Sequence, residues 1–231
     1  MTKKDKVILS LENVGYRYDD APKDEYVFKD ISYEFKSGKM YAVKGKSGSG
    51  KTTLLSLISG LEKKYIGKIH FEDKDLSKIN LDKYRNSEIG IVFQSYNLLP
   101  HLTASENIIL SMDINGLKKI NKKEEALRLL KNVGLTEEHK NRRVLKLSGG
   151  EQQRVAIARS LSYNPKMIIA DEPTGNLDQE TENEILKIFK RLAHEEGKCV
   201  VIVTHSKNVW EQCDEVYELQ RNKKTSFQKN N

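Results

Sequence analysis

A glycine-rich segment at residues 45–52, Gly-Lys-Ser-Gly-Ser-Gly-Lys-Thr, carries the strongest chemical signal in the chain. It fits the pattern Gly-x-x-x-x-Gly-Lys-Ser/Thr, in which glycines let backbone N–H groups turn inward around phosphate oxygens. The preceding residues indicate a strand and the following ones a helix, whose N-terminus would add the positive end of its dipole. The alternative, a flexible glycine-serine loop, does not account for this context. We expect phosphate contacts from Gly45, Lys46, Ser47, Gly48, Ser49, Gly50, Lys51, Thr52 and Thr53.

Two of these residues and two later acids would form a reaction centre. The Lys51 ammonium would reach the β- and γ-phosphates, and the Thr52 hydroxyl would ligate Mg²⁺. Residues 167–172, Met-Ile-Ile-Ala-Asp-Glu, indicate a hydrophobic strand that ends in two carboxylates. Asp171 is a candidate Mg²⁺ ligand, and Glu172 is placed to polarise an attacking water. Two acids after a strand are by themselves more typical of a helix cap or a solvated loop, so this interpretation depends on the upstream phosphate loop.

His205 and Gln94 are candidates because of their place in the expected sheet. His205 ends an apolar strand at residues 199–205, and ligands of open parallel sheets bind at the carboxyl ends of the strands. We expect it to contact the γ-phosphate, although a lone histidine is more typical of a satisfied surface or core residue. Gln94 stands where the sheet gives way to helices, and from there it would ligate Mg²⁺ beside the nucleotide.

A second pair of glycines occurs in Leu-Ser-Gly-Gly-Glu-Gln-Gln-Arg, residues 147–154. Ser148 and Glu151 have the spacing of a capping box and predict the start of a helix. Gly149 and Gly150 would then occupy its first turn, where each costs roughly 0.5–1 kcal/mol relative to alanine. An ordinary capped helix explains the serine and the glutamate but neither glycine. The residues alone leave open what keeps two poor helix formers at this helix start.

The pattern of apolar residues predicts the elements that would position these side chains. Strands are expected within residues 7–43, and further strands at 68–73, 89–94, 167–172 and 199–205. Helices are expected after residue 51, through most of 98–163, at 180–196 and at 207–213. This alternation of strands and helices predicts a parallel sheet that is interrupted by a helical insert at about 97–160.

Length and charge limit the classes of function. The 231 residues suffice for one large domain or two small ones. The formal net charge is +7, of which +2 lies in residues 1–6 and +4 in residues 221–231, so the remainder is close to neutral and we expect no nucleic-acid partner. No apolar stretch approaches the ~20 residues of a membrane span, and no secretory signal is expected. Cys199 and Cys213 lack metal-type spacing, which indicates reduced thiols.

These motifs occur in the order and approximate spacing of the ATP-binding-cassette ATPases, and the chain resembles that family from Val7 to about Leu219. The resemblance rests on residues 45–52, Gln94, 147–154, 167–172, Gly-Asn-Leu-Asp at 175–178, and His205. It implies an α/β fold, a P-loop NTPase (RecA-like) core with an N-terminal antiparallel β subdomain and an inserted α-helical subdomain. The implied division is one ATPase domain at 7–220, with its core at 7–96 and 161–220 and its helical subdomain at about 97–160, between basic tails at 1–6 and 221–231.

The resemblance also implies the roles of residues that the motifs alone leave open. Two domains would pack head to tail, so that Ser148, Gly149 and Gly150 approach the γ-phosphate held by the other copy. Asp178 would line this interface beside the facing phosphate loop. Tyr18 would stack on adenine; of Tyr16 and Tyr18, at most one can do so, and the alternative is a cross-strand packing pair.

The catalytic set implied by the resemblance is Glu172 as general base with His205 and Lys51. Gln94 would join the nucleotide to the helical subdomain, which would meet a permease.

Two departures from the family pattern stand out. Lys46 replaces a proline that is frequent in this branch, and residues 141–146 lack the usual His-Pro pair.

Residues 171–178 and 97–108 resemble one branch of the family, which serves lipoprotein release, macrolide export and antimicrobial-peptide resistance. The implied protein is an ATPase that uses ATP and Mg²⁺ and lies in the cytoplasm, peripheral on the inner face of the membrane. Its partners would be a second copy of itself and an integral membrane permease, with or without an extracytoplasmic accessory protein. A cell-division ATPase that regulates a membrane partner without transport is the alternative. A DNA-repair or translation-factor cassette is disfavoured, because the chain has one phosphate loop and no coiled-coil pattern.

Overall fold

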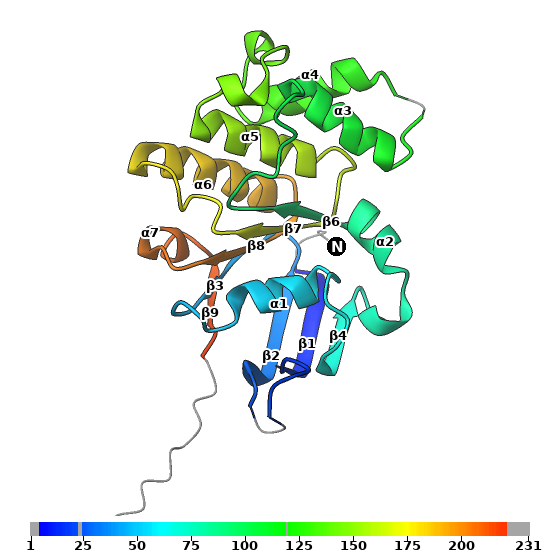
Figure 1. Ribbon diagram of the computed structural model, residues 1–231, viewed down its shortest axis with the longest axis vertical. Coiled ribbons are helices and arrows are strands. Elements are labelled where there is room, and N and C mark those ends of the chain that lie inside the picture. The colour runs from blue at the N-terminus through cyan, green and yellow to red at the C-terminus, as the bar shows by residue number, and fades with distance from the viewer. Residues whose placement is uncertain (1–4, 23–24, 119, 221–231) are drawn as a thin grey trace, which may run out of the picture.

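A five-stranded parallel sheet forms the centre of the molecule, and a four-stranded antiparallel sheet lies beside it (Figure 1). The computed structural model describes residues 5–22, 25–118 and 120–220. Residues 1–4 of the predicted N-terminal tail and all of the predicted tail at 221–231 lie outside the described residues. The α/β fold class that the sequence predicts is confirmed.

The parallel sheet is built from strands that end at the predicted motifs. Its spatial order is β6, β7, β8, β3, β9, and each neighbouring pair runs parallel. The central strands are apolar along nearly their whole length, as expected where helices cover both faces. The strands are β6 (Ile89–Val92), β7 (Met167–Asp171), β8 (Cys199–Thr204), β3 (Met40–Lys44) and β9 (Glu215–Glu218).

Helices pack on both faces of this sheet, with α1 on one side and α5 and α6 on the other (Figure 1). The α-helices are α1 (Lys51–Ile58), α2 (Leu81–Lys83), α3 (Ala104–Ile114), α4 (Lys122–Asn132), α5 (Gly149–Ser160), α6 (Gln179–His194) and α7 (Lys207–Trp210). Shorter turns of 3₁₀ type occur at Leu76–Lys78, Glu137–His139 and Val144–Lys146, and a π-helical turn at Tyr84–Glu88. No helix within the described ranges has the length and apolar content needed to cross a membrane.

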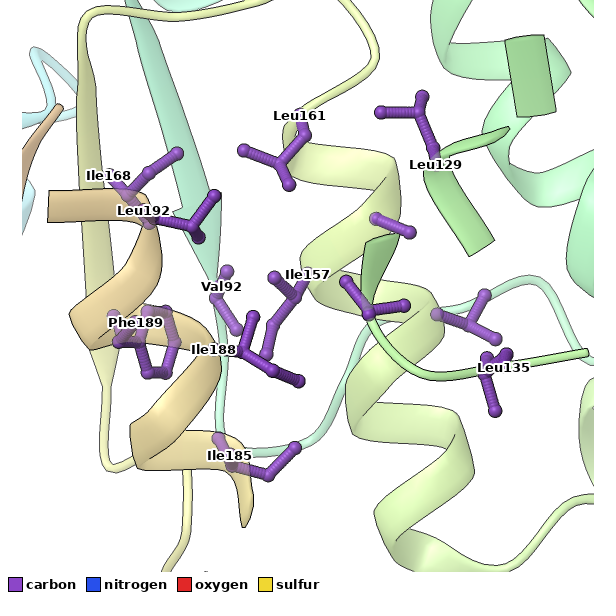
Figure 2. Packing of buried hydrophobic residues seen from close by; sticks show 14 of the residues in the cluster. Val92, Leu129, Leu135, Ile157, Leu161, Ile168, Ile185, Ile188, Phe189 and Leu192 are labelled. Atoms are coloured by element: carbon purple, nitrogen blue, oxygen red, sulfur yellow. The ribbon is translucent and has the colours of Figure 1, made fainter. Parts of the chain in front are cut away.

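The alternation along each strand divides the core into two hydrophobic clusters. Ile168 belongs to the cluster that contains α5 and α6, and its neighbour Ile169 to the cluster that contains α1, because successive side chains of a strand point to opposite faces. Figure 2 shows Ile185, Ile188 and Phe189 of α6 in the first cluster, near Ile157 and Val92. The spacing of three and four residues along α6 is what forms its single apolar face.

The antiparallel sheet has the order β2, β1, β4, β5. Its buried Phe28, Phe35 and Phe71 join the same cluster as α1, so the two sheets share one hydrophobic core. The strands are β1 (Val7–Tyr16), β2 (Phe28–Lys36), β4 (Ile66–Phe71) and β5 (Lys74–Asp75).

Helices α3, α4 and α5 pack on one another, which agrees with a helical insert. Their buried residues, however, form a single cluster with those of α6 and the parallel sheet. The hydrophobic core thus gives no sharp boundary at residues 97 and 160, and the division into subdomains stays a prediction.

Three local features differ from the predictions. The strands on either side of Ser37 and Gly38 do not pair, because β2 joins the antiparallel sheet and β3 the parallel one. The pattern at residues 215–218 does not predict a strand, yet β9 forms there as a short edge strand beside β3. The helix expected at 207–213 ends at Trp210, so Cys213 follows α7 rather than lying in it.

Tyr217 fastens β9 to the antiparallel sheet. Its ring stacks on the Tyr33 ring with centroids 4.1 Å apart, and its hydroxyl donates to the backbone oxygen of Glu34 at 2.8 Å. Burial raises the pKa of Tyr33 to about 12, so this phenol stays neutral at physiological pH. Since β9 pairs with β3 directly before the glycine-rich loop, the aromatic contact supports that loop from the edge of the sheet.

Replacing Tyr217 by alanine should lower the free energy of unfolding by about 2 kcal/mol, because the stacked ring and its hydrogen bond are both lost. Tyr217→Phe keeps the ring and should cost at most about 1 kcal/mol. Thermal unfolding of both variants checks this, with a loss of roughly 2–4 °C in Tm for each kcal/mol in a domain of this size. Equal losses in the two variants would contradict the role given to the ring.

Candidate functional site

The glycine-rich loop leaves β3 and enters α1, which is the strand–loop–helix context that the sequence predicts. Gly50 has φ +94°, and a Cβ on it would lie 2.5 Å from Cγ1 of Val27. A Cβ on Gly45 would lie 2.6 Å from the backbone oxygen of Leu219. Both positions therefore exclude a side chain, and the backbone can curl more tightly than any other residue would allow.

The N-terminus of α1 follows directly on the glycine-rich loop, and no side chain in the described part of the protein caps its backbone N–H groups. Its N-cap residue is Gly50, which has no side chain to cap it, and the first turn contains no acidic residue. The Lys51 ammonium donates to the backbone oxygens of Gly45 at 2.8 Å and Lys46 at 3.2 Å. The Ser49 hydroxyl is buried and has no hydrogen-bond partner among the described residues. Uncapped N–H groups at a helix start together with an ammonium fit phosphate oxygens.

A cavity of about 450 Å³ opens beside this loop. Its lining consists of residues that the sequence predicts together with Val27, which it does not. They are Tyr18, Val27, Ser47, Gly48, Gly50, Lys51, Thr52, Thr53, Gln94, Asp171 and Glu172. Segments far apart in the sequence, from residue 18 to residue 172, thus meet around one space.

Tyr18 and Tyr16 have different environments, as expected if at most one of them can stack on a ligand. The Tyr18 ring is half exposed, and its hydroxyl lies 3.5 Å from the Thr53 hydroxyl at the edge of the cavity. Tyr16 is buried and packs across the sheet on Phe28. Only Tyr18 is free to meet a ligand.

Asp171 ends β7 and lines the cavity together with Thr52. Burial, and then the neighbouring charge of Glu172, raise the pKa of this carboxyl, while Lys51 and Thr52 act in the opposite direction. A desolvated carboxylate next to another acid is stabilised by a cation. The oxygens of Thr52, Asp171 and Gln94 are the hard donors that Mg²⁺ prefers. Across the described residues there is no group of three or more His, Cys, Asp or Glu that could hold a metal instead.

Glu172 is held by the end of β8. Its Oε2 accepts from the Thr204 hydroxyl at 2.9 Å, and its Oε1 lies 2.7 Å from Nδ1 of His205. The backbone of Glu172 has φ +43°, a left-handed conformation that is uncommon outside glycine and typical of functional sites. The pairing of Glu172 with His205 is a contact that neither motif signals alone.

Ser148, Gly149 and Gly150 lie outside the cavity, at the start of α5. The predicted capping box is confirmed, since Glu151 N donates to Ser148 Oγ at 3.3 Å and Ser148 N donates to Glu151 Oε2 at 2.7 Å. The helix start therefore has the geometry that the sequence predicts, but it does not share the cavity lined by the predicted phosphate loop.

The two glycines also have a reason within the chain that the sequence did not reveal. A Cβ on Gly150 would lie 2.5 Å from Cγ2 of Thr181, and one on Gly149 would lie 3.1 Å from the Tyr96 hydroxyl. Gly149 also lies near Leu177. Close packing against the segment that leads into α6 thus accompanies, and does not exclude, the predicted approach to an anion.

Asp178 ends that segment, and Gln94 lies beside its Gly175. Asp178 caps α6 by accepting from Thr181 N at 3.0 Å, and it lies outside the cavity. The Gln94 amide lines the cavity and contacts Gly175, on which a Cβ would lie 3.1 Å from Gln94 Nε2. Gln94 therefore touches both the cavity and the loop before α6.

Lys44, the last residue of β3, is held between the edge strand and the only tryptophan of the sequence. Its ammonium lies 3.3 Å from a carboxylate oxygen of Glu218 and 5.2 Å from the centre of the Trp210 ring. Leu219 N donates to Lys44 O at 2.8 Å and extends the pairing of β9 to the beginning of the loop. These contacts fix Lys44, the residue directly before the glycine-rich loop.

A parallel sheet with a phosphate-shaped loop after one strand and an acidic pair after another defines a P-loop nucleoside triphosphatase. Comparison with known proteins narrows the class. The family model described as ABC transporter matches residues 28–175. Curated relatives include an uncharacterized ABC transporter ATP-binding protein of Bacillus subtilis, YclH, which is 46% identical over 87% of this chain and 88% of its own length. The lipoprotein-releasing system ATP-binding protein LolD of Francisella tularensis is 40% identical over 92% of this chain and 94% of its own length.

Among solved structures, the ATP-binding cassette MJ0796, a dimer in a post-hydrolysis state with ADP and Pi, superposes with a TM-score of 0.83. It is 37% identical, and the match covers 92% of this chain and 94% of that one. The chain belongs to the ABC transporter family, as one of its ATP-binding ATPase proteins.

Asp171→Asn should raise the Tm of the nucleotide-free protein by about 2 °C at pH 7, because it removes a carboxylate whose pKa is raised by burial and by Glu172. The same change should abolish the further rise in Tm that Mg²⁺ gives in the presence of ATP. For the parent, this Mg²⁺ effect should fade as the pH falls, since protons then compete with the cation for Asp171.

Thermal unfolding with and without Mg²⁺ and ATP measures both effects. Asp75→Asn is the control, because hydrogen bonds from Ser77 lower the pKa of Asp75 and its charge is not a source of instability. An Asp171→Asn protein that is less stable than the parent and still responds to Mg²⁺ would contradict the assignment.

Proposed function

We propose that this chain is the ATP-hydrolysing subunit of a transporter, which dimerises head to tail around two molecules of ATP and drives a separate membrane permease. One observation carries the proposal: most of the candidate phosphate loop lines one cavity with Gln94, Asp171 and Glu172, while Ser148, Gly149 and Gly150 stand at the start of a helix outside it. A second copy of the chain would supply that helix to the phosphates. The dimeric state of the relative MJ0796 supports this arrangement.

The loop at residues 45–53 is assigned to the phosphates. Lys51 Nζ would exchange its bonds to the carbonyls of Gly45 and Lys46 for bonds to β- and γ-phosphate oxygens, which are better acceptors for an ammonium. The free N–H groups at the start of α1 would face the β-phosphate. Tyr18, half exposed at the edge of the cavity, would stack on adenine.

Thr52, Gln94 and Asp171 would hold Mg²⁺. The ion supplies charge neutralisation between the β- and γ-phosphates when bound. Thr52 and Asp171 both line the cavity and would turn their oxygens to the ion. Gln94 would complete the set and, through its contact with Gly175, register the presence of the nucleotide in the loop before α6.

Glu172 would act as the general base. Its Oε1 would take a proton from a water in line with the γ-phosphate, which is the role of a carboxylate at this position in a P-loop enzyme. His205 would keep that carboxylate in line through Nδ1, now 2.7 Å away, and contact the γ-phosphate through Nε2. A protonated imidazole donates from both nitrogens and can make the two contacts together.

The start of α5 would close over the γ-phosphate held by the other copy. Ser148 Oγ and the N–H groups of Gly149 and Gly150 would donate to it, and the helix dipole would add to the attraction. Asp178, exposed at the start of α6, would line the same interface. Closure would then require nucleotide, and hydrolysis would reopen the dimer.

The residues at about 97–160 would meet the permease, with Gln94 joining this surface to the nucleotide. The branch proposed is that of the lipoprotein-release, macrolide-export and peptide-resistance systems, which the 40% identity with LolD supports. The chain would then work in the cytoplasm, on the inner face of the membrane, with the permease and with or without an accessory protein outside.

Glu172→Gln should leave ATP binding intact and lower the turnover number at least about 100-fold, since a general base typically contributes 10²–10⁴. Because ATP is then not consumed, a dimer should become visible on size-exclusion chromatography when ATP is added. Adding Lys51→Ala to this variant removes the phosphate contact and should leave it monomeric. Hydrolysis by Glu172→Gln at the parental rate would disprove the assignment of the base.

Gly150→Ala separates the two reasons for a glycine at position 150. The new methyl would meet Thr181 Cγ2, and it would also hold the backbone away from a phosphate. Thr181→Ser removes that Cγ2 and keeps the hydroxyl that donates to Asp178 at 2.7 Å. We expect ATPase activity to fall about tenfold in Gly150→Ala, the size of one lost charge-assisted hydrogen bond.

Adding Thr181→Ser should not restore the activity of Gly150→Ala, and Thr181→Ser alone should behave as the parent. Full recovery in the double variant would mean that Gly150 serves only packing within the chain. Steady-state ATPase assays of the three variants decide between the two reasons.

A further inference from the structure

Glu182, in the first turn of α6, joins segments that carry the two sides of the reaction centre. Its Oε2 accepts from the Thr174 hydroxyl at 2.8 Å and from the Ser206 hydroxyl at 3.3 Å. Its Oε1 accepts from the Asn208 side-chain amide at 2.5 Å. One carboxylate thus receives three hydrogen bonds from two loops and from α7.

The two hydroxyls belong to the loops that hold Glu172 and His205. Thr174 is buried and lies two residues after Glu172, and Ser206 directly follows His205. These loops follow β7 and β8, which are neighbours in the sheet. Glu182 connects the two loops through α6, the helix that contains it.

The chemistry at this position favours a carboxylate. An ionised carboxylate only accepts, so it can receive hydroxyl and amide donors on both oxygens without a donor of its own that would need a partner. It lies at the N-terminal end of α6, where the helix dipole favours negative charge. The three donors are neutral, so Glu182 gains hydrogen bonds of the charge-assisted kind without an ion pair.

We propose that Glu182 is a positioning residue for ATP hydrolysis, which sets the geometry between Glu172 and His205 by holding the loops behind them. The inference rests on the proposed roles of Glu172 and His205. Glu172 has a left-handed backbone and is fixed by its bond to Val203, with Glu172 N donating to Val203 O at 2.8 Å. Among the described residues of the loop at 173–177, Thr174 alone has a side-chain hydrogen bond to α6.

The effect should fall on turnover and not on nucleotide affinity. Glu182 does not line the cavity, so the contacts that bind ATP remain when it is replaced. Misplacement of a catalytic group by about 1 Å can lower a rate by about 100-fold. Loosening of the two loops should therefore lower kcat and leave KM nearly constant.

The experiment compares Glu182→Ala, Glu182→Gln and the control Glu180→Gln, which removes an exposed charge from the same helical turn. Glutamine keeps the shape and an acceptor for the hydroxyls, but its amide would oppose the amide of Asn208. We expect kcat to fall about tenfold in Glu182→Ala and less in Glu182→Gln, with KM for ATP within about twofold of the parent. Glu180→Gln should match the parent.

Two further measurements separate positioning from a general loss of structure. Thermal unfolding shows that each variant is folded at the assay temperature. In the Glu172→Gln background, addition of Glu182→Ala should leave the ATP-dependent dimer in place, because neither the cavity nor the start of α5 is changed.

Parental kcat in Glu182→Ala would overturn the inference, as would a large rise in KM or loss of the ATP-dependent dimer. A parent protein without ATPase activity would instead overturn the proposed function. The failures of the two proposals are therefore distinct.

Discussion

The site depends on a steric constraint at the turn between β3 and α1. The backbone oxygen of Leu219 occupies the space that a side chain on Gly45 would need, and Val27 does the same at Gly50. With side chains excluded at both places, the backbone can turn its N–H groups toward one cavity. Leu219, directly after the edge strand β9, and Val27, directly before β2, thus set the curvature of the phosphate loop.

The start of α6 is the second point on which the architecture depends. Within one turn, Asp178 caps the helix, the Thr181 methyl packs against Gly150, and Glu182 receives donors from two loops. The segment in front of this turn contacts Gln94 at Gly175. Three segments therefore contact the first turn of α6: the start of α5, the loop after Glu172 and the loop after His205. A shift of one of them should displace the others, because close-packed interiors transmit strain.

Features that are local in sequence could be predicted, and contacts between distant segments could not. The glycine-rich loop, the capping box of Ser148 and Glu151, and the apolar strands are each written in a few adjacent residues, and the structure confirms them. β9 could not be predicted, because its stability comes from Tyr33 and β3, far away in the chain.

The same reason explains what was missed at the site. Ser148 and Glu151 signal a cap, but the packing of Gly150 depends on Thr181, on another helix. Glu182 lies among other acids at a helix start, where sequence reasoning gives it no role beyond the helix dipole. The role proposed for it depends on hydrogen bonds from Thr174 and Ser206, on two loops that are distant in sequence from each other. The Trp210 ring is likewise brought by the fold to a distant segment, since it lies beside Lys44, directly before the phosphate loop. As the only indole in the chain, it is an intrinsic fluorophore whose emission should report when that loop is filled, without any attached dye.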